Sequence, residues 1–206
     1  MKALSTCVLT MMFLLALVCR AEEKPADVKL EPLFNGKDLS GFKVPEPNVW
    51  WKVVDGVLVG ESDGVSADQK KGNVLFTEKS YGDFALEADV RFPNDIDSGF
   101  IYSKSPDLQV QIGVSRSLKK DMTCSIYYKG KYPGVAQGVD KLLKVGDWNR
   151  IRMEVKGKVT KVWLNGQHVL TWECPEALKP APIGLQIHPG VKMKVEFKDL
   201  QIAELK

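Results

Sequence analysis

The chain has 206 residues, with 29 basic and 26 acidic side chains and a formal net charge of +3. Residues 1–21 resemble a secretory signal, because Lys2 precedes an uncharged apolar run and Cys19-Arg20-Ala21 offers small residues to a signal peptidase. Removing that segment leaves 27 basic and 26 acidic residues, a net charge of +1. So balanced a charge gives no support for nucleic acid or an anionic membrane surface as a partner.

The signal predicts a protein that is secreted or periplasmic after cleavage, with no membrane span in its mature form. Lipid anchoring at Cys19 is the minority alternative, since Val18 stands where lipoproteins usually have Gly or Ala. The two remaining cysteines, Cys124 and Cys174, could form one disulfide in an exported protein, although nothing in their spacing requires it. Neither belongs to a Cys/His metal pattern, so we expect no zinc site.

Beyond a short charged tail at 22–29, expected to be mobile, residues 30–206 form one predicted domain of short strands. Asp55-Gly56 and Asn165-Gly166 each lie between strand-like runs and predict tight β-hairpins. No segment keeps a helical period over the roughly 11 residues that the test needs. We therefore expect an all-β fold, a jelly-roll β-sandwich of two antiparallel sheets. Further strands are expected at 74–77, 84–92, 108–113, 124–128, 148–156, 159–164, 168–172, 183–188 and 191–202, with irregular chain at 114–122 and a loop at 129–140.

The predicted strand at 108–113 alternates strictly, with Leu, Val and Ile on one face and Gln109 and Gln111 on the other. Two amides projecting together from a sheet could bind a hydroxyl-rich ligand, because each offers donors and an acceptor. From the alternation alone, an ordinary solvated outer face is the favoured alternative.

The predicted strand at 183–188 repeats this geometry, with Gly184, Gln186 and His188 on its polar face. Gly184 would leave space there for something to approach. A glutamine and a histidine on one face could bind sugar hydroxyls, and a histidine can move a proton near neutral pH. The alternative is a strand-end histidine held by local hydrogen bonds before Pro189.

Other chemistry has less support in the sequence. Asp95 and Asp97 could contribute to a calcium site, but an Asp-rich turn formed for backbone reasons is the favoured interpretation, and we expect no cofactor. Glu87 and Asp89 share a strand face but alternate in a charged pattern typical of a solvated surface, not of a glycosidase carboxylate pair. The motifs of serine hydrolases, phosphate-binding loops and HExxH zinc proteases are absent from the sequence.

A set of motifs occurring in one order is more specific than any single one. The set resembles the 3-keto-disaccharide hydrolase domain family, which has a concanavalin A-like jelly-roll fold, and the resemblance covers roughly residues 30–204. Its members are Leu33-Phe34-Asn35-Gly36-Lys37-Asp38-Leu39-Ser40-Gly41, Trp51 with Asp55-Gly56, Asp97-Ser98-Gly99, Gln109-Val110-Gln111, Trp148-Asn149, Leu164-Asn165-Gly166 and Ile183-Gly184-Leu185-Gln186-Ile187-His188.

The resemblance implies cleavage of glycosides whose sugar is oxidised at C3, by hydrolysis or by elimination and hydration. Such a reaction needs a base, a group that stabilises an enolate and a proton donor, because the ketone acidifies the hydrogen on C2. The chain departs from the family pattern where Asp97 replaces Asn, where Gln109 replaces Glu, and where Ser103-Lys104 stands at an Arg position.

On this basis the expected catalytic residues are His188 as acid or base and Lys104 as anion stabiliser. The expected ligand is a glycoside or oligosaccharide with a 3-keto sugar, bound by Gln109, Gln111, Gln186, Tyr127 and Asp97. Two rivals remain: a lectin-like carbohydrate-binding module without catalysis, and a sandwich with a purely structural or interaction role. Convergence of these side chains in one pocket would favour the enzyme and the carbohydrate-binding module over the structural role.

Overall fold

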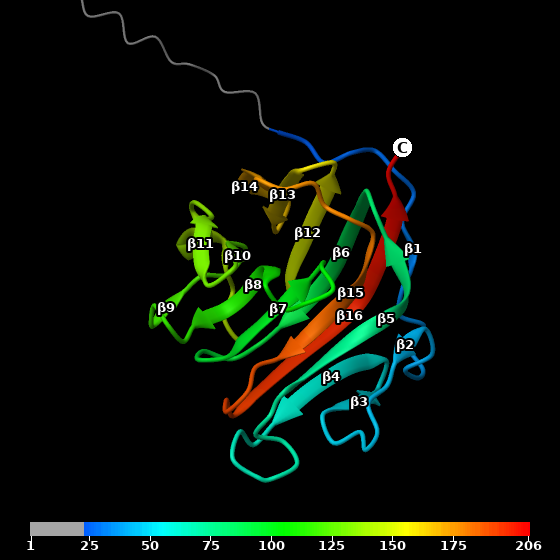
Figure 1. Ribbon diagram of the computed structural model, residues 1–206, viewed down its shortest axis with the longest axis vertical. Coiled ribbons are helices and arrows are strands. Elements are labelled where there is room, and N and C mark those ends of the chain that lie inside the picture. The colour runs from blue at the N-terminus through cyan, green and yellow to red at the C-terminus, as the bar shows by residue number, and fades with distance from the viewer. Residues whose placement is uncertain (1–22) are drawn as a thin grey trace, which may run out of the picture.

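A computed structural model describes residues 23–206, so the predicted signal segment and Cys19 lie outside the described residues. The described chain folds into two antiparallel sheets, and the predicted all-β sandwich is confirmed (Figure 1). Sheet I contains β1 (Glu31–Pro32), β3 (Trp51–Val54), β4 (Val57–Ser62), β6 (Phe84–Arg91), β12 (Asn149–Lys156), β13 (Val159–Leu164), β14 (Gln167–Glu173) and β16 (Met193–Glu204). Sheet II contains β2 (Phe42–Lys43), β5 (Asn73–Tyr81), β7 (Asp97–Ile101), β8 (Leu108–Ser115), β9 (Lys120–Asp121), β10 (Ile126–Tyr128), β11 (Lys131–Gly134) and β15 (Ala181–Ile187).

Strand order differs from chain order, so segments far apart in the sequence lie side by side. Sheet I runs β14-β13-β12-β6-β16-β4-β3, with β1 paired to β16. Sheet II runs β11-β10-β8-β7-β15-β5-β2, with β9 paired to β8. This order places β15, near the end of the chain, beside β7 and close to β8 (Figure 1).

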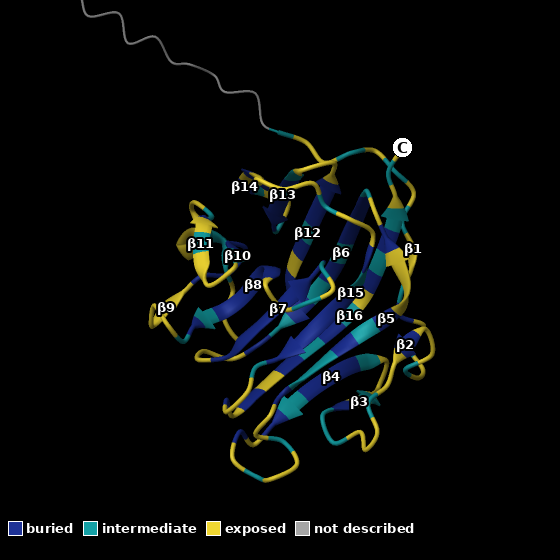
Figure 2. Ribbon diagram, viewed as in Figure 1, coloured by how far each residue is buried: buried dark blue, intermediate teal, exposed yellow. Residues whose placement is uncertain are grey.

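The core lies between the sheets, where the apolar faces of alternating strands meet. Phe100 of β7 packs on Phe197 of β16 across this interface, with ring centroids 5.9 Å apart. Val110 and Ile112 of β8 are fully buried, as their alternation predicted. In Figure 2 the buried residues follow the strands, while the exposed residues gather in the loops at the rim.

Both predicted tight hairpins are present. Asp55 and Gly56 have φ angles of 50° and 79°, and Asn165 and Gly166 have φ angles of 51° and 85°. Two consecutive residues with positive φ are what a type I′ turn requires, and its twist matches that of the strands it joins. The register Val54↔Val57 follows for the first hairpin and Leu164↔Gln167 for the second.

The sequence-based boundaries are wrong in the middle of the chain. The loop expected at 129–140 contains β11 and the start of α1 (Val139–Leu142), and the irregular segment at 114–122 contains β9. These elements have two to four residues, too few for a periodic pattern to be seen. Within residues 23–206, no helix has the length and apolar character needed to cross a membrane.

Residues of the expected mobile tail make contacts with sheet I: Trp163 Nε1 donates to the Glu23 carbonyl at 2.8 Å, and the Ala26 amide donates to Glu154 Oε1 at 2.8 Å.

Cys124 and Cys174 are both buried and free, so the disulfide left open by the sequence does not form in this structure.

Candidate functional site

A hollow of about 390 Å³ lies on the outer face of sheet II, where β7, β8 and β15 run side by side. It contains six of the seven residues that the sequence predicted for a site, although they come from four separate strands or strand ends. The six are Asp97, Gln109, Gln111, Tyr127, Gln186 and His188.

The pairing of β8 with its neighbours explains why the two amides of β8 share this hollow. Gln109 and Gln111 alternate with core residues, and they lie opposite Ile101 and Gly99 of β7. They are only 4% and 0% exposed, so the solvated outer face that the alternation favoured is wrong. Tyr127, which pairs with Gln109 from β10, also lines the hollow. The sequence pattern shows which face carries these amides but not what covers that face.

A chain of side-chain hydrogen bonds joins β8 to β7. Gln109 Nε2 donates to Gln111 Oε1 at 2.9 Å, and Gln111 Nε2 donates to Asp97 Oδ1 at 2.9 Å. Tyr132 adds its hydroxyl, which donates to Gln111 Oε1 at 3.0 Å. These bonds fix the orientation of both amides, because an amide NH2 can only donate and an amide oxygen can only accept.

Asp97 and His188 face each other at one end of this chain. The Arg116 amide donates to Asp97 Oδ2 at 3.2 Å, and His188 Nε2 lies 3.9 Å from the same oxygen. His188 Nδ1 lies 2.8 Å from the Pro189 carbonyl, which can only accept, so Nδ1 carries the proton. Nε2 is then the ring nitrogen free to take a proton, beside a carboxylate that would stabilise the resulting charge. The local hydrogen bond expected in the structural alternative is therefore present, and it orients the ring toward the hollow.

Three polar atoms of side chains that line the hollow are buried without a hydrogen-bond partner. They are Gln109 Oε1 and Gln186 Oε1, which are acceptors, and Arg116 Nε, which is a donor. Among residues 23–206 only one other buried side-chain atom, Tyr128 Oη, shares this condition. Burying a polar atom unpaired costs about 1–3 kcal/mol, so such atoms concentrated in one hollow indicate a site for a ligand that pairs them.

Tyr132 and Tyr127 form an aromatic wall, with ring centroids 5.5 Å apart in an edge-to-face arrangement. Burial raises the pKa of Tyr132 to about 12; a hydrogen bond with Ser115 opposes the shift and the charge of Asp97 supports it. The Tyr132 hydroxyl therefore stays protonated at neutral pH and acts as a donor. Tyr132 was not among the predicted site residues, because it lies in the segment expected to be a loop.

Two glycines on this face have different roles. A Cβ on Gly99 would lie 3.0 Å from Gln109 Oε1 and 2.9 Å from the Val110 carbonyl, so Gly99 makes room for the amide. The space expected beside Gly184 is instead filled by the protein: a Cβ there would lie 2.5 Å from Val74 Cγ1 and 2.8 Å from Phe76 Cε1. Gly184 thus serves packing against β5, and the prediction of an open approach at this residue is wrong.

The structure does not bring Lys104 into the site. Lys104 lines a separate hollow with Tyr128, Lys129 and Glu176. The basic side chain present beside Asp97 is that of Arg116, which follows β8 in a segment where the sequence offered no pattern. Asp95, considered above for calcium, accepts a hydrogen bond from Arg116 Nη1 at 2.7 Å. Within the described residues, no group of three or more His, Cys, Asp or Glu side chains is arranged to hold a metal ion.

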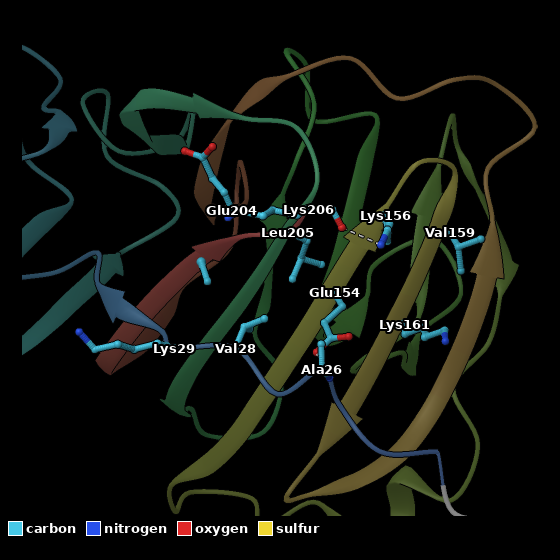
Figure 3. Close-up of a pocket in the computed structure, with 11 residues that line it drawn as sticks. Ala26, Val28, Lys29, Glu154, Lys156, Val159, Lys161, Glu204, Leu205 and Lys206 are labelled. Carbon is cyan, nitrogen blue, oxygen red and sulfur yellow. Dashed lines mark hydrogen bonds between the residues drawn. The ribbon is translucent and has the colours of Figure 1, made fainter.

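A larger hollow, of about 890 Å³, lies on the outer face of sheet I beside the N-terminal segment (Figure 3). The Glu154 carboxylate in its floor accepts from the Ala26 amide and from Arg152 Nη2, each at 2.8 Å. Lys156 Nζ donates to the Lys206 carbonyl at 2.8 Å. No side-chain atom buried without a partner belongs to the described residues that line it, so the larger volume does not mark the better site.

Comparison with solved structures finds similar folds with low sequence identity. A candidate glycosyl hydrolase from Parabacteroides distasonis has a TM-score of 0.66 at 22% identity, over 86% of this chain and 94% of that chain. A second from the same organism has a TM-score of 0.63 at 23% identity, over 86% and 100%. The β-glucanase of Bacillus licheniformis has a TM-score of 0.56 at 13% identity, over 86% and 98%. These similarities confirm the jelly-roll fold.

The search of curated proteins finds no match. The sequence profile of a domain described as 3-keto-alpha-glucoside-1,2-lyase-like matches residues 29–203, which is most of the chain and all of the site. The chain therefore belongs to the 3-keto-alpha-glucoside-1,2-lyase-like domain family.

Proposed function

We propose that the hollow on sheet II binds a glycoside of a 3-keto sugar and that the protein cleaves its glycosidic bond. The observation that carries the proposal is the set of unpaired polar atoms in the hollow. Gln109 Oε1 and Gln186 Oε1 can each accept a hydrogen bond from a sugar hydroxyl. Tyr127 and Tyr132 offer aromatic surface of the kind that packs against a pyranose ring. Family membership supports a sugar with a ketone at C3 as the proposed ligand.

The first step in this proposal is proton removal from C2 by His188 Nε2. The C3 ketone acidifies that hydrogen, and the electron pair of the broken C–H bond moves onto the ketone as an enolate. Asp97, whose Oδ2 lies 3.9 Å from Nε2, stabilises the imidazolium that forms. A histidine is suited to this step because its ordinary pKa lies near neutrality.

The second step expels the substituent on C1. The enolate reforms the ketone, a double bond forms between C1 and C2, and the departing oxygen takes the proton that His188 holds. Addition of water across the double bond then gives the free 3-keto sugar, so the overall reaction is a hydrolysis. Two opposed carboxylates are not needed, which agrees with a site where position 109 is an amide.

The test is release of the aglycone from a chromogenic 3-keto-glucoside by the protein lacking residues 1–21. The parent glucoside, which has a hydroxyl at C3, should not be cleaved. His188→Ala should lower kcat by about 100-fold or more, as expected for loss of a general base. His168→Ala is the matched control, because the other histidine of the chain lies on β14 of sheet I, bonded to Thr171. Turnover that is unchanged in His188→Ala would remove this residue from the mechanism.

The second candidate is a carbohydrate-binding module without catalysis, and the amide at position 109 favours it over a conventional glycosidase. Calorimetry separates the two proposals. Binding of the 3-keto-glucoside with no aglycone release from the wild-type protein would support the module and contradict the enzyme. From the signal-like segment at residues 1–21, we propose further that the protein acts outside the cytoplasm.

A further inference from the structure

Arg116 is held in the hollow on sheet II by contacts that use only part of its guanidinium group. Nη1 donates to Asp95 Oδ1 at 2.7 Å, and Nη2 donates to the Asp95 carbonyl at 2.8 Å. Asp95 itself has a φ angle of 69°, which is uncommon for a residue other than glycine. The turn at Asp95 thus presents a carboxylate and a carbonyl together, and both engage the terminal nitrogens of one side chain.

The third nitrogen of this guanidinium, Nε, is buried and has no partner. It cannot lose its proton, because an arginine remains charged in proteins at any ordinary pH. A charged donor forms stronger hydrogen bonds than a neutral one and costs more when it is left unpaired. Nε–H is the one donor among the buried, unpartnered side-chain atoms of the described residues that line the hollow.

The position of Arg116 relates it to the proposed base. Its amide donates to Asp97 Oδ2, the same oxygen that lies 3.9 Å from His188 Nε2. Arg116 and His188 therefore approach Asp97 at one oxygen. Both residues also line the hollow, so one ligand in it can contact Arg116 and His188.

The three unpaired atoms differ in what they require of a ligand. Gln109 Oε1 and Gln186 Oε1 require donors, which sugar hydroxyls supply, whereas Arg116 Nε requires an acceptor oxygen. In a 3-keto sugar the C3 carbonyl oxygen is an acceptor that cannot donate. It is also the atom on which negative charge develops when C2 loses its proton. A fixed charged donor at that oxygen stabilises the enolate more than it stabilises the substrate, which lowers the barrier.

We propose that Arg116 Nε–H binds the C3 carbonyl oxygen and stabilises the enolate, with Asp95 as the residue that positions the guanidinium. The assignment rests on the proposed function. It places on Arg116 the role that the sequence suggested for Lys104, which the structure puts in another hollow.

The experiment compares Arg116→Met and Arg116→Lys with the wild type in aglycone release from a 3-keto-glucoside. Arg116→Met should lower kcat by about 100-fold, the usual effect of losing an oxyanion donor, with a smaller change in KM. Arg116→Lys keeps the charge but cannot hold two contacts to Asp95 and a third to the ligand, so it should recover only part of the rate. Added methylguanidinium should restore activity to Arg116→Ala, which a purely structural role would not allow.

Asp95→Asn tests the positioning role, and Arg150→Met serves as a control variant. Asp95→Asn keeps an acceptor oxygen at the same place and should lower kcat by less than about tenfold, while KM changes little. Arg150→Met removes an arginine of sheet I whose guanidinium contacts Asp89, and it should leave kcat unchanged. Thermal unfolding of each variant identifies any that fail to fold, and methylguanidinium rescue then serves as the deciding measurement.

The outcomes distinguish this assignment from the proposed function. If the wild type releases aglycone and folded Arg116→Met does so within threefold of its rate, the assignment to Arg116 is overturned while the function stands. If the wild type binds the sugar without releasing aglycone, calorimetry compares its affinity for the 3-keto-glucoside with its affinity for the parent glucoside. The assignment requires that Arg116→Met lose the preference for the keto sugar. An unchanged preference overturns the assignment. If the wild type binds neither sugar, the proposed function and the assignment both fall.

Discussion

The larger hollow on sheet I has its buried polar groups paired, whereas the smaller hollow on sheet II does not. The hollow on sheet I measures about 890 Å³, and the hollow on sheet II about 390 Å³. The first lies on a face whose buried and partly buried charges are paired: Arg152 binds Glu154 at 2.8 Å, and Arg91 binds Glu196 at 2.7 Å. The second contains two unpaired amide oxygens and an unpaired guanidinium nitrogen.

This difference has a physical meaning. Paired polar groups on sheet I have their hydrogen bonds satisfied within the protein, so they contribute to stability and have little left to offer a ligand. Unpaired groups on sheet II cost stability in the empty protein, and a ligand that pairs them recovers that cost. Substitution of a paired polar group should therefore change stability, and substitution of an unpaired group of the hollow should change binding.

The largest effect is expected from Gln111→Leu, which breaks the hydrogen-bond chain of the site at its centre. The substitution leaves Asp97 Oδ1, Gln109 Nε2 and the Tyr132 hydroxyl without their present partner. We expect the free energy of unfolding to fall by about 3 kcal/mol, since several buried groups lose a bond at once. Urea unfolding measures this. A loss below about 1 kcal/mol would mean that the three groups find other partners, and that the chain does not hold the site together.

The second largest effect on stability is expected from Glu154→Leu, in the floor of the hollow on sheet I. Glu154 and Arg152 have side chains only 11% and 12% exposed, and Glu154 also accepts from the Ala26 amide. Removing the carboxylate takes one partner from Arg152 and one from the Ala26 amide, so we expect a stability loss of about 2 kcal/mol. Sugar affinity measured by calorimetry should not change. A tenfold weaker affinity would show that the two faces are coupled and would break the comparison.

Gln186→Met should weaken sugar binding without lowering stability, which is the reverse of the effect expected from Glu154→Leu. Gln186 is 7% exposed and its Oε1 has no partner, so replacement by an apolar side chain of similar length removes an unsatisfied acceptor. We expect unfolding free energy to stay equal or rise by about 0.5 kcal/mol, and sugar affinity to fall about tenfold. Glu154→Leu is the matched control from the other face. Unchanged affinity together with lower stability would contradict the assignment of Gln186 to the site.

These residues also show how far the sequence could be interpreted alone. Alternation placed Gln109, Gln111, Gln186 and His188 on the correct faces of their strands, because side-chain direction follows from a period of two. It could not show that the amides are buried, since burial depends on two short strands in an irregular part of the chain: β10 pairs with β8, and β11 pairs with β10. Arg116 follows β8 in that irregular part of the chain, so no periodic signal marked it.

Lys104 shows the corresponding limit of a motif. Ser103-Lys104 stands where the family pattern has an Arg, but spacing along the chain does not determine where a side chain points after the strand ends. β7 ends at Ile101, and the chain beyond it leads Lys104 into a hollow with Tyr128 and Glu176. Residues on regular strands, and His188 directly after one, were therefore predictable, whereas Lys104, three residues past the end of β7, was not.

The smallest effect concerns the pH dependence of the paired face. The hydrogen bond from Arg91 is the main cause that lowers the pKa of Glu196 below its ordinary value near 4.5. A carboxylate with a lowered pKa contributes stability above its unfolded pKa and loses it as the pH falls through the folded pKa. We expect Glu196→Gln to cost about 0.5 kcal/mol at pH 7, because Arg91 is partly exposed and solvent screens the pair. Below the folded pKa of Glu196 the variant and the wild type should be equally stable in urea unfolding. A difference that is unchanged between pH 7 and the acid limit would mean that Glu196 contributes through packing and not through its charge.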